Sequence, residues 1–162
     1  MQKNSKNERD KMAIKKIDIK NRDVAKTVLN IQLASYKVEA GIIGYDDIPP
    51  LHDTIESLQH CGESFYGFYL DDELCGAISF KMEKNIMDIH RLVVHPDQFR
   101  KGIASKLLTY IYDLDNIEGI VVSTATLNTP AITFYEKHGF YKEKEEKINE
   151  QLSLSFFRKE KK

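Results

Sequence analysis

Residues 92–104 combine the end of an apolar strand, a basic loop and a glycine at the expected start of a helix. The N–H groups in the first turn of a helix lack intrahelical partners and carry a partial positive charge, so they attract phosphate groups. Gly102 and Ala104 leave space for such a ligand, and Arg100 and Lys101 add positive charge. These residues predict an anion site, although a glycine at such a junction also occurs simply as a turn residue.

The common nucleotide motifs do not occur in this chain. It has neither the GxGxxG pattern of dinucleotide-binding folds nor the GxxxxGKS/T pattern of phosphate-binding loops. A phosphate-bearing ligand therefore needs a different arrangement of donors.

Two segments together resemble the motifs of the GNAT superfamily of N-acetyltransferases. Val94-His95-Pro96 followed by residues 100–104 is similar to the family's acyl-CoA-binding motif, Gln/Arg-x-x-Gly-x-Gly/Ala. Phe99 stands where that motif carries Gln or Arg. Residues 128–140 are similar to the second hallmark, an Asn, a small residue and a Tyr on a helix that ends in Gly-Phe. The two motifs have the expected order and separation, and the resemblance in element order spans residues 13–157.

The periodicity of apolar residues predicts the elements that would position these motifs. Residues 1–12 show no periodicity, and we expect a tail there, followed by one domain over 13–162. The predicted strands cover 13–19, 64–70, 74–82, 86–94, 117–124, 140–148 and 151–157. Helices are predicted from Asn21 or Asp23 to Lys37, over 51–60, over 103–112, and from a Thr129 cap to Gly139. The resemblance implies the GNAT fold, an α/β (α+β) domain whose mostly antiparallel mixed sheet has about seven strands and about four flanking helices.

The resemblance further implies acetyl-CoA as co-substrate, no metal, and a gap between the strands at 86–94 and 117–124 that admits the pantetheine arm. The backbone of Leu92 and Val94 would pair with its amides, and residues 100–105 would hold the pyrophosphate. The implied cofactor-binding residues are Leu92, Val93, Val94, Arg100, Lys101, Gly102, Ile103, Ala104, Ser105, Asn128, Ala131 and Tyr135.

Direct transfer to an amine needs an acid, a base and an oxyanion donor. By resemblance Tyr135 is the acid that protonates the departing thiolate; the alternative is a tyrosine that anchors its helix beside Phe134. Asp88 and His90 share one strand face and are the candidate bases, although both also suit a solvated strand, and a water chain is a further alternative. The N–H group of Val93 or Val94 is the expected oxyanion donor, and no cysteine nucleophile is needed.

The formal charge of −1 hides an uneven distribution along the chain. The window 38–80 contains nine Asp or Glu residues and no Lys or Arg, whereas residues 81–106 carry six Lys or Arg against three acids. Carboxylates around an acceptor pocket would attract an ammonium group. We therefore expect an amine acceptor, either a small molecule or a peptide; a solvated acidic face is the alternative.

Composition narrows the remaining classes of function. A chain of 162 residues with 41% hydrophobic residues can bury one core, and its two cysteines do not require a disulfide. No signal peptide or membrane span is visible, and near-zero net charge argues against nucleic acid. We expect a cytoplasmic protein, with a homodimer as one oligomeric state to consider. The competing function is an acyl-CoA-binding sensor or regulatory module without turnover.

Overall fold

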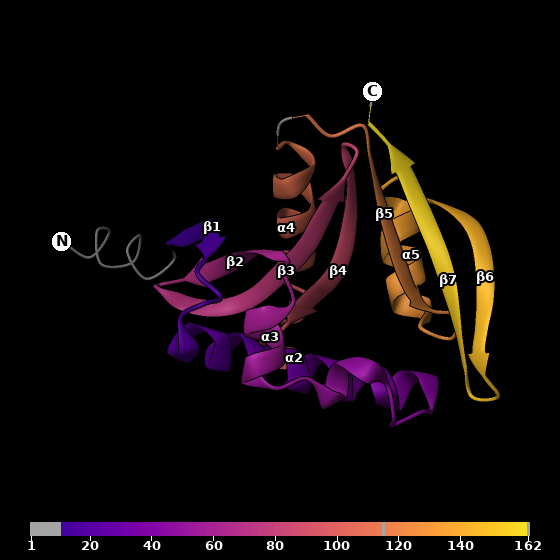
Figure 1. The fold of residues 1–162 in the computed structure, drawn as a ribbon, viewed down its shortest axis with the longest axis horizontal. Helices are drawn as coiled ribbons and strands as arrows, with labels where there is room; N and C mark the ends of the chain where they lie inside the picture. Colours follow the sequence, from indigo (N-terminus) through magenta and orange to yellow (C-terminus); the bar gives the residue numbers. More distant parts are fainter. Residues whose placement is uncertain (1–10, 115, 162) are drawn as a thin grey trace.

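A seven-stranded sheet with helices packed on both faces forms the fold, seen in a computed structural model that describes residues 11–114 and 116–161 (Figure 1). The strands are β1 (Met12–Ile17), β2 (Ser64–Leu70), β3 (Glu73–Glu83), β4 (Ile86–Val94), β5 (Gly119–Ala125), β6 (Tyr141–Asn149) and β7 (Leu152–Glu160). The helices are α2 (Arg22–Ile43), α3 (Ile55–His60), α4 (Ile103–Tyr112) and α5 (Thr129–Lys137), with 3₁₀ turns at Pro49–His52 and Pro96–Gln98. The predicted fold class is confirmed. Residues 1–10 of the predicted tail lie outside the described residues.

The sheet opens in its middle, between β4 and β5. Its strand order is β1-β2-β3-β4-β5-β7-β6, and every neighbouring pair is antiparallel except β4 with β5. These two strands pair only over Ile86–Ile89 and Gly119–Val122, and then diverge (Figure 1). The last residues of both strands therefore line a gap, as the sequence predicts.

A bulge in β4 sets which of its side chains point to the α4 face of the sheet and which point to the α2 face. Ile89 pairs with Phe80, whereas Arg91 pairs with Ser79, so His90 is an extra residue in β4. Strict alternation would place Ile89 and Arg91 on the same face. The bulge instead leaves Ile89 with Leu92 and Val94 on the α4 side and turns Arg91 and Val93 toward α2.

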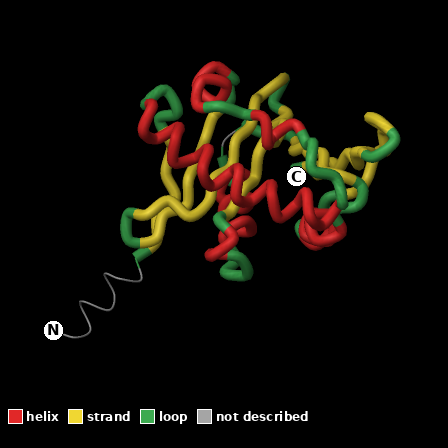
Figure 2. Tube along the Cα trace, turned by 90° about the horizontal axis from the view of Figure 1, so that it is seen from below, coloured by secondary structure: helices red, strands yellow, loops and turns green. Residues whose placement is uncertain are grey.

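The helices cover the two faces through separate core clusters. Helix α4 and the inner face of α5 pack with β2, β3 and β4 in the largest cluster. Helix α2 lies across the opposite face, as Figure 2 shows from below, and packs there with α3. A third cluster joins the end of α2 to β5 and β7 through Ala40, Ile43, Ala125 and Leu152. Helix α2 therefore spans the gap and contacts both halves of the sheet.

Helix α2 extends six residues beyond its predicted end at Lys37. It continues through Gly41 to Ile43, and Gly44 ends it in the left-handed conformation (φ 73°), with its N–H donating to Ala40 O at 2.9 Å. A helical Gly costs about 1 kcal/mol relative to Ala. Burial of Ala40 and Ile43 against β5 and β7 offsets that cost.

Two further helices also differ from the predictions. Asn128, not Thr129, caps α5, because its Oδ1 accepts from the Ala131 N–H at 3.2 Å. The predicted helix over 51–60 is divided into the 3₁₀ turn at Pro49–His52 and α3, which begins after the cap Thr54. The extra turn places Pro49 and Pro50 against the gap in the sheet.

Candidate active site

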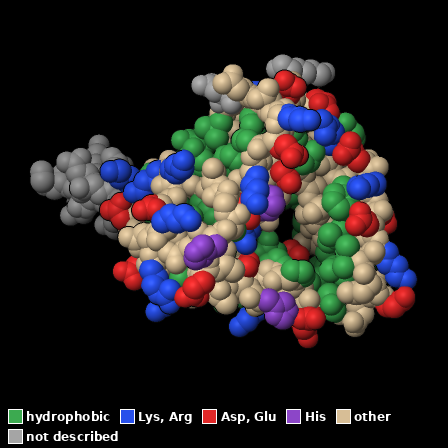
Figure 3. All heavy atoms as spheres, in the orientation of Figure 1, with side chains coloured by type: hydrophobic (Ala, Val, Ile, Leu, Met, Phe, Trp, Pro, Cys, Tyr) green, Lys and Arg blue, Asp and Glu red, His purple; other side chains and the backbone are tan. Residues whose placement is uncertain are grey.

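Two cavities meet at the gap in the sheet, and Figure 3 shows the molecule hollowed there between β4 and β7. We call them the α4 cavity, about 320 Å³, which lies beside residues 98–105, and the β5 cavity, about 360 Å³, which lies beside residues 122–125. Glu39, Leu92, Ala131 and Tyr135 line both. Groups bound in the two cavities would therefore contact one another at these four residues.

The α4 cavity is built around an uncapped helix start. Gly102 precedes α4 with φ 76° and provides no side-chain cap. The first intrahelical bond runs from the Lys106 N–H to Gly102 O at 3.0 Å, so the N–H groups of residues 103–105 precede it. Arg100, also at positive φ (66°), turns the loop toward the cavity and lines it. These features suit an anionic group, as the sequence predicts.

The structure brings together most of the predicted cofactor-binding residues. Those that line the α4 cavity are Leu92, Val94, Arg100, Gly102, Ile103, Ala104, Ser105, Asn128, Ala131 and Tyr135. Lys101 does not line it: its Nζ donates to Gln98 Oε1 at 2.8 Å on the surface. Phe99, which stands at the usual Gln or Arg position of the motif, lines the cavity with a ring that is 38% exposed.

Val93 does not occupy the predicted position. The His95 N–H donates to Cys75 O, and hydrogen-bonded and non-hydrogen-bonded pairs alternate along antiparallel strands, so Val93 with Ala77 is a hydrogen-bonded pair. Its N–H and C=O face β3, and its side chain is buried on the α2 face. By the same alternation, Leu92 and Val94 direct their backbone groups into the gap. Of the two predicted oxyanion donors, only Val94 fits.

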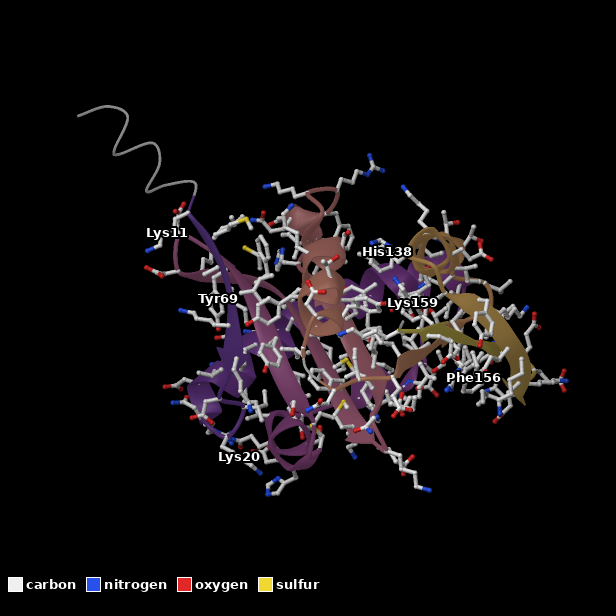
Figure 4. All side chains as sticks on the ribbon, turned by 90° about the horizontal axis from the view of Figure 1, so that it is seen from above. Lys11, Lys20, Tyr69, His138, Phe156 and Lys159 are labelled. Carbon is white, nitrogen blue, oxygen red and sulfur yellow. The ribbon has the colours of Figure 1, made fainter. Side chains whose placement is uncertain are left out.

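Ser105 is held by a histidine from the end of α5. His138 Nδ1 lies 2.8 Å from Phe134 O and must donate to it, because a carbonyl only accepts. In the neutral imidazole, Nε2 then accepts from Ser105 Oγ, which lies 2.8 Å away. Figure 4 shows His138 on the side of α5 that faces α4. This contact fixes the distance between the two helices that flank the α4 cavity.

At the junction of the cavities, Tyr135 lies beside a carboxylate. Its ring is anchored in the core by Phe134 and Phe140, both at 5.3 Å between centroids. Burial, followed by the charge of Glu39, raises the pKa of Tyr135 above its usual range, and the same two effects raise the pKa of Tyr36. Tyr135 is therefore a core anchor that also lines both cavities, and its role as the acid stays a prediction.

Glu39 is the site residue that the sequence analysis missed. Its Oε1 accepts from Asn128 Nδ2 at 3.0 Å, which ties α2 to the cap of α5. Burial raises the pKa of Glu39, and the Asn128 hydrogen bond only partly opposes that rise. The signal was present in the spacing of Tyr36, Ala40 and Ile43, which continues the helical period of α2 past Lys37.

The two predicted bases lie differently with respect to the β5 cavity. His90 lines it, and its ring nitrogens lie 3.4 Å from Glu63 Oε2 and 3.4 Å from Asp88 Oδ2. Asp88 lines neither cavity. Burial, and then the charge of Glu83, raises the pKa of Asp88, whereas His90 lowers it. The pair shares one strand face, as predicted, but only His90 reaches the cavity.

The acidic window does not converge on the β5 cavity. Of its nine carboxylates, all of them among the described residues, only Glu39 lines either cavity. Arg91 binds Asp53 and Glu63, Arg22 binds Glu56, and the Asp71–Glu73 turn joins β2 to β3. The expectation of a broadly acidic acceptor pocket is therefore corrected to a single carboxylate.

A sequence profile described as an acetyltransferase (GNAT) domain matches residues 61–142. This match covers half of the chain, so the chain belongs to the GNAT acetyltransferase family. Within residues 11–114 and 116–161 we find no group of three or more His, Cys, Asp or Glu side chains placed to hold a metal. None of the described helices is both long and apolar enough to cross a membrane.

Among curated proteins, the chain is 40% identical over 139 residues to the UPF0157 protein YqkA of Bacillus subtilis (strain 168). The aligned region is 85% of this chain but 40% of YqkA, so the chain spans less than half the length of that relative.

Similar folds occur among solved structures. The PaiA N-acetyltransferase of Thermoplasma acidophilum, in complex with coenzyme A, is 21% identical, with a TM-score of 0.72 over 93% of this chain and 99% of that one. The ribosomal-protein-S18-alanine N-acetyltransferase of Escherichia coli is 12% identical, with a TM-score of 0.74 over 93% of this chain and 94% of that one. At these identities the likeness is one of fold.

Proposed function

We propose that this protein transfers an acetyl group from acetyl-CoA directly to a primary amine. The observation that carries the proposal is the meeting of two cavities at Glu39 and Tyr135, one beside an anion-binding helix start and one beside a carboxylate. The complex of a similarly folded acetyltransferase with coenzyme A supports the choice of co-substrate.

The chain offers suitable partners for each part of acetyl-CoA. The N–H groups of residues 103–105 and the Arg100 guanidinium would hold the pyrophosphate. The free backbone groups of Leu92 and Val94 would pair with the pantetheine amides. This path leads along the gap to Tyr135, where the thioester would lie.

The proposed step forms one bond and breaks one. The bound ammonium gives one proton to the base, and the neutral nitrogen bonds to the thioester carbon as the carbon–sulfur bond breaks. The Tyr135 hydroxyl gives the departing sulfur its proton, and a second proton from the nitrogen restores that hydroxyl. The Val94 N–H stabilises the negative charge that develops on the carbonyl oxygen. Because its pKa is raised, Tyr135 stays protonated across the pH range of an assay.

We assign the base to Glu39 in preference to His90 or Asp88. Glu39 lines both cavities beside Tyr135, and burial brings the pKa of its carboxyl closer to neutral pH, where a base is most effective. His90 lines only the β5 cavity and is engaged by two carboxylates. Asp88 lines neither.

A pH profile would report this base. Activity needs the ionised carboxylate, and the pKa of Glu39 is raised, so kcat/KM should fall on the acid side at a pH above the ordinary range of a glutamate. Stopped assays of kcat/KM between pH 4 and about pH 9 would measure this fall on the acid side. A profile that is flat down to the ordinary glutamate range would exclude Glu39 as the base.

The transfer itself is tested by measuring CoA release from acetyl-CoA with a panel of amines, together with mass spectrometry of the acceptors. We expect amine-dependent release with one acetyl group added per CoA. Tight binding of acetyl-CoA with no acetylated amine would favour the sensor function instead.

From the sequence alone we also propose a single domain over 13–162 that acts in the cytoplasm without nucleic acid or membrane. A homodimer stays a proposal to be tested by light scattering.

A further inference from the structure

We propose that the β5 cavity takes a primary monoamine with an apolar body, whose ammonium group pairs with Glu39. This inference rests on the proposed acetyl transfer, because it names the acceptor class of the same site. It excludes acceptors that carry a second positive charge into the cavity, such as polyamines and aminoglycosides.

The wall of the β5 cavity is mostly apolar. Its apolar lining residues come from six elements and the loop before the first 3₁₀ turn: Ile48, Pro49, Pro50, Ile89, Leu92, Val122, Ala125, Ala131, Ile148, Leu152 and Leu154. Several of these belong to the core cluster that joins α2 to β5 and β7. A hydrocarbon placed there would gain about 25 cal/mol for each Å² removed from water.

The charged side chains that line this cavity offer one anion to a ligand. Glu39 is the sole carboxylate among the described residues that line it. Arg91 also lines it, but binds Asp53 at 3.0 Å and also Glu63, and its side chain is only 13% exposed. His90 lies between Glu63 and Asp88. Those carboxylates are therefore occupied by groups of the protein itself.

A second ammonium group would enter this cavity at a loss. Removing an ionised group from water costs several kcal/mol unless an opposite charge replaces the water. Glu39 would already be paired with the reacting amine, and the far wall, at Leu152 and Leu154, is apolar. The cavity therefore favours acceptors that carry one positive charge and an apolar body.

The position of Glu39 fixes the orientation of the acceptor. Because Glu39 lies where the two cavities meet, an ammonium group bound to it lies beside the thioester, and the body extends toward Ile48 and Leu154. The exposed residues Pro49 and Ile148 form the outer rim. At about 30 Å³ per water-sized group, 360 Å³ holds about a dozen non-hydrogen atoms.

Two matched comparisons with the whole 162-residue chain test the proposal through kcat/KM. Across unbranched amines from ethylamine to hexylamine, each added methylene should raise kcat/KM about fourfold, as expected for burial of a CH₂ group. Hexylamine and 1,6-diaminohexane differ in one ammonium group, and the monoamine should be at least about tenfold better.

Binding measured without turnover separates this proposal from the proposed function. Isothermal titration of hexylamine into the protein saturated with CoA, which carries no acetyl group, should show binding. Glu39→Gln, which retains an oxygen that can accept from Asn128 Nδ2, should weaken this binding about tenfold or more, the loss expected for a charged hydrogen bond. Asp46→Asn, an exposed carboxylate of the same acidic window outside both cavities, should leave affinity unchanged.

The outcomes are distinct. Acetylation in which the diamine equals or exceeds hexylamine, or in which chain length has no effect, overturns the acceptor class while the transfer stands. Glu39-dependent binding of hexylamine without acetylation supports the acceptor class and overturns the proposed transfer. If hexylamine neither binds the CoA complex nor reacts, the acceptor class is wrong.

Discussion

Replacing Tyr135 by Phe should lower kcat by about 100-fold to 10,000-fold, the range expected when a positioned proton donor is lost. The ring packs between Phe134 and Phe140 in the core, and phenylalanine preserves that packing. Only the hydroxyl at the junction of the cavities is removed. We therefore expect the affinity for acetyl-CoA and the melting temperature to stay close to the wild-type values while turnover is lost.

Steady-state kinetics with titration calorimetry would measure this effect. The matched control is Tyr110→Phe, which removes a hydroxyl from α4 at a residue that lines neither cavity. Retention of more than a third of the wild-type kcat in Tyr135→Phe would show that Tyr135 acts only as the core anchor that the sequence also allows.

Replacing Arg91 by Leu should destabilise the protein by about 3–5 kcal/mol, the cost of removing one partner from a buried ion pair. Its guanidinium binds Asp53 and Glu63, whose side chains are 19% and 5% exposed, from the face of β4 that the bulge turns toward α2. Gln32 Nε2 donates to Asp53 at 2.7 Å, and Ser79 Oγ donates to Glu63 at 2.6 Å. Neither neutral donor replaces the lost charge.

Urea unfolding at several pH values would test this prediction. In the wild type, burial raises the pKa of Asp53, but hydrogen bonds from Gln32, Arg91 and Ser57 outweigh burial and leave it lowered. This group's stabilisation is complete above the unfolded pKa of about 3.9 and is lost as pH falls through the folded value.

In Arg91→Leu the two carboxylates stay buried without the cation. Lowering the pH until they are neutral should therefore reduce the difference in the free energy of unfolding between this variant and the wild type. Arg22→Leu breaks an ion pair with Glu56 of similar length, 2.7 Å, on the surface, and should leave the free energy of unfolding unchanged. Equal losses in the two variants would contradict a buried network.

The sequence predicts the layout of the sheet because its strands carry strong local signals. Residues 86–94 are mostly apolar and coincide with β4, and 103–112 coincide with α4. The antiparallel meander follows from element order, and the divergence of β5 from β4 is implied by the family resemblance. The helix start at Gly102 was also predictable, because Gly102 and the basic loop are contiguous in sequence.

The junction of the cavities was harder to predict from the sequence, because it depends on contacts between segments that are distant along the chain. Glu39 meets Asn128 only because tertiary packing of Ala40 and Ile43 carries α2 past Gly41. The apolar spacing of Tyr36, Ala40 and Ile43 continues the helical period, but Gly41 lowers the local helix propensity, and only tertiary packing offsets that loss. The bulge at His90 similarly shifts the alternation of β4 side chains by one residue, so counting in twos from Ile89 would put the Val93 side chain on the wrong face of the sheet.

The acidic window also differs from its prediction, because most of its carboxylates do not lie at the cavities in the structure. Nine carboxylates in one stretch of sequence suggest a broad attractive field, yet most are engaged elsewhere. Asp53, Glu56 and Glu63 pair with arginines, Asp47 contacts His52, and residues 71–73 lie at the turn between β2 and β3. A count of charges in the sequence therefore overestimates how many carboxylates line the β5 cavity, where Glu39 is the one such residue among those described.

A crystal structure of the protein with acetyl-CoA tests the central claim most directly. We predict the pyrophosphate at the N–H groups of residues 103–105, the pantetheine along Leu92 and Val94, and the thioester within hydrogen-bonding reach of the Tyr135 hydroxyl. Acetyl-CoA bound with its thioester outside the gap between β4 and β5, away from Tyr135 and Glu39, would contradict it.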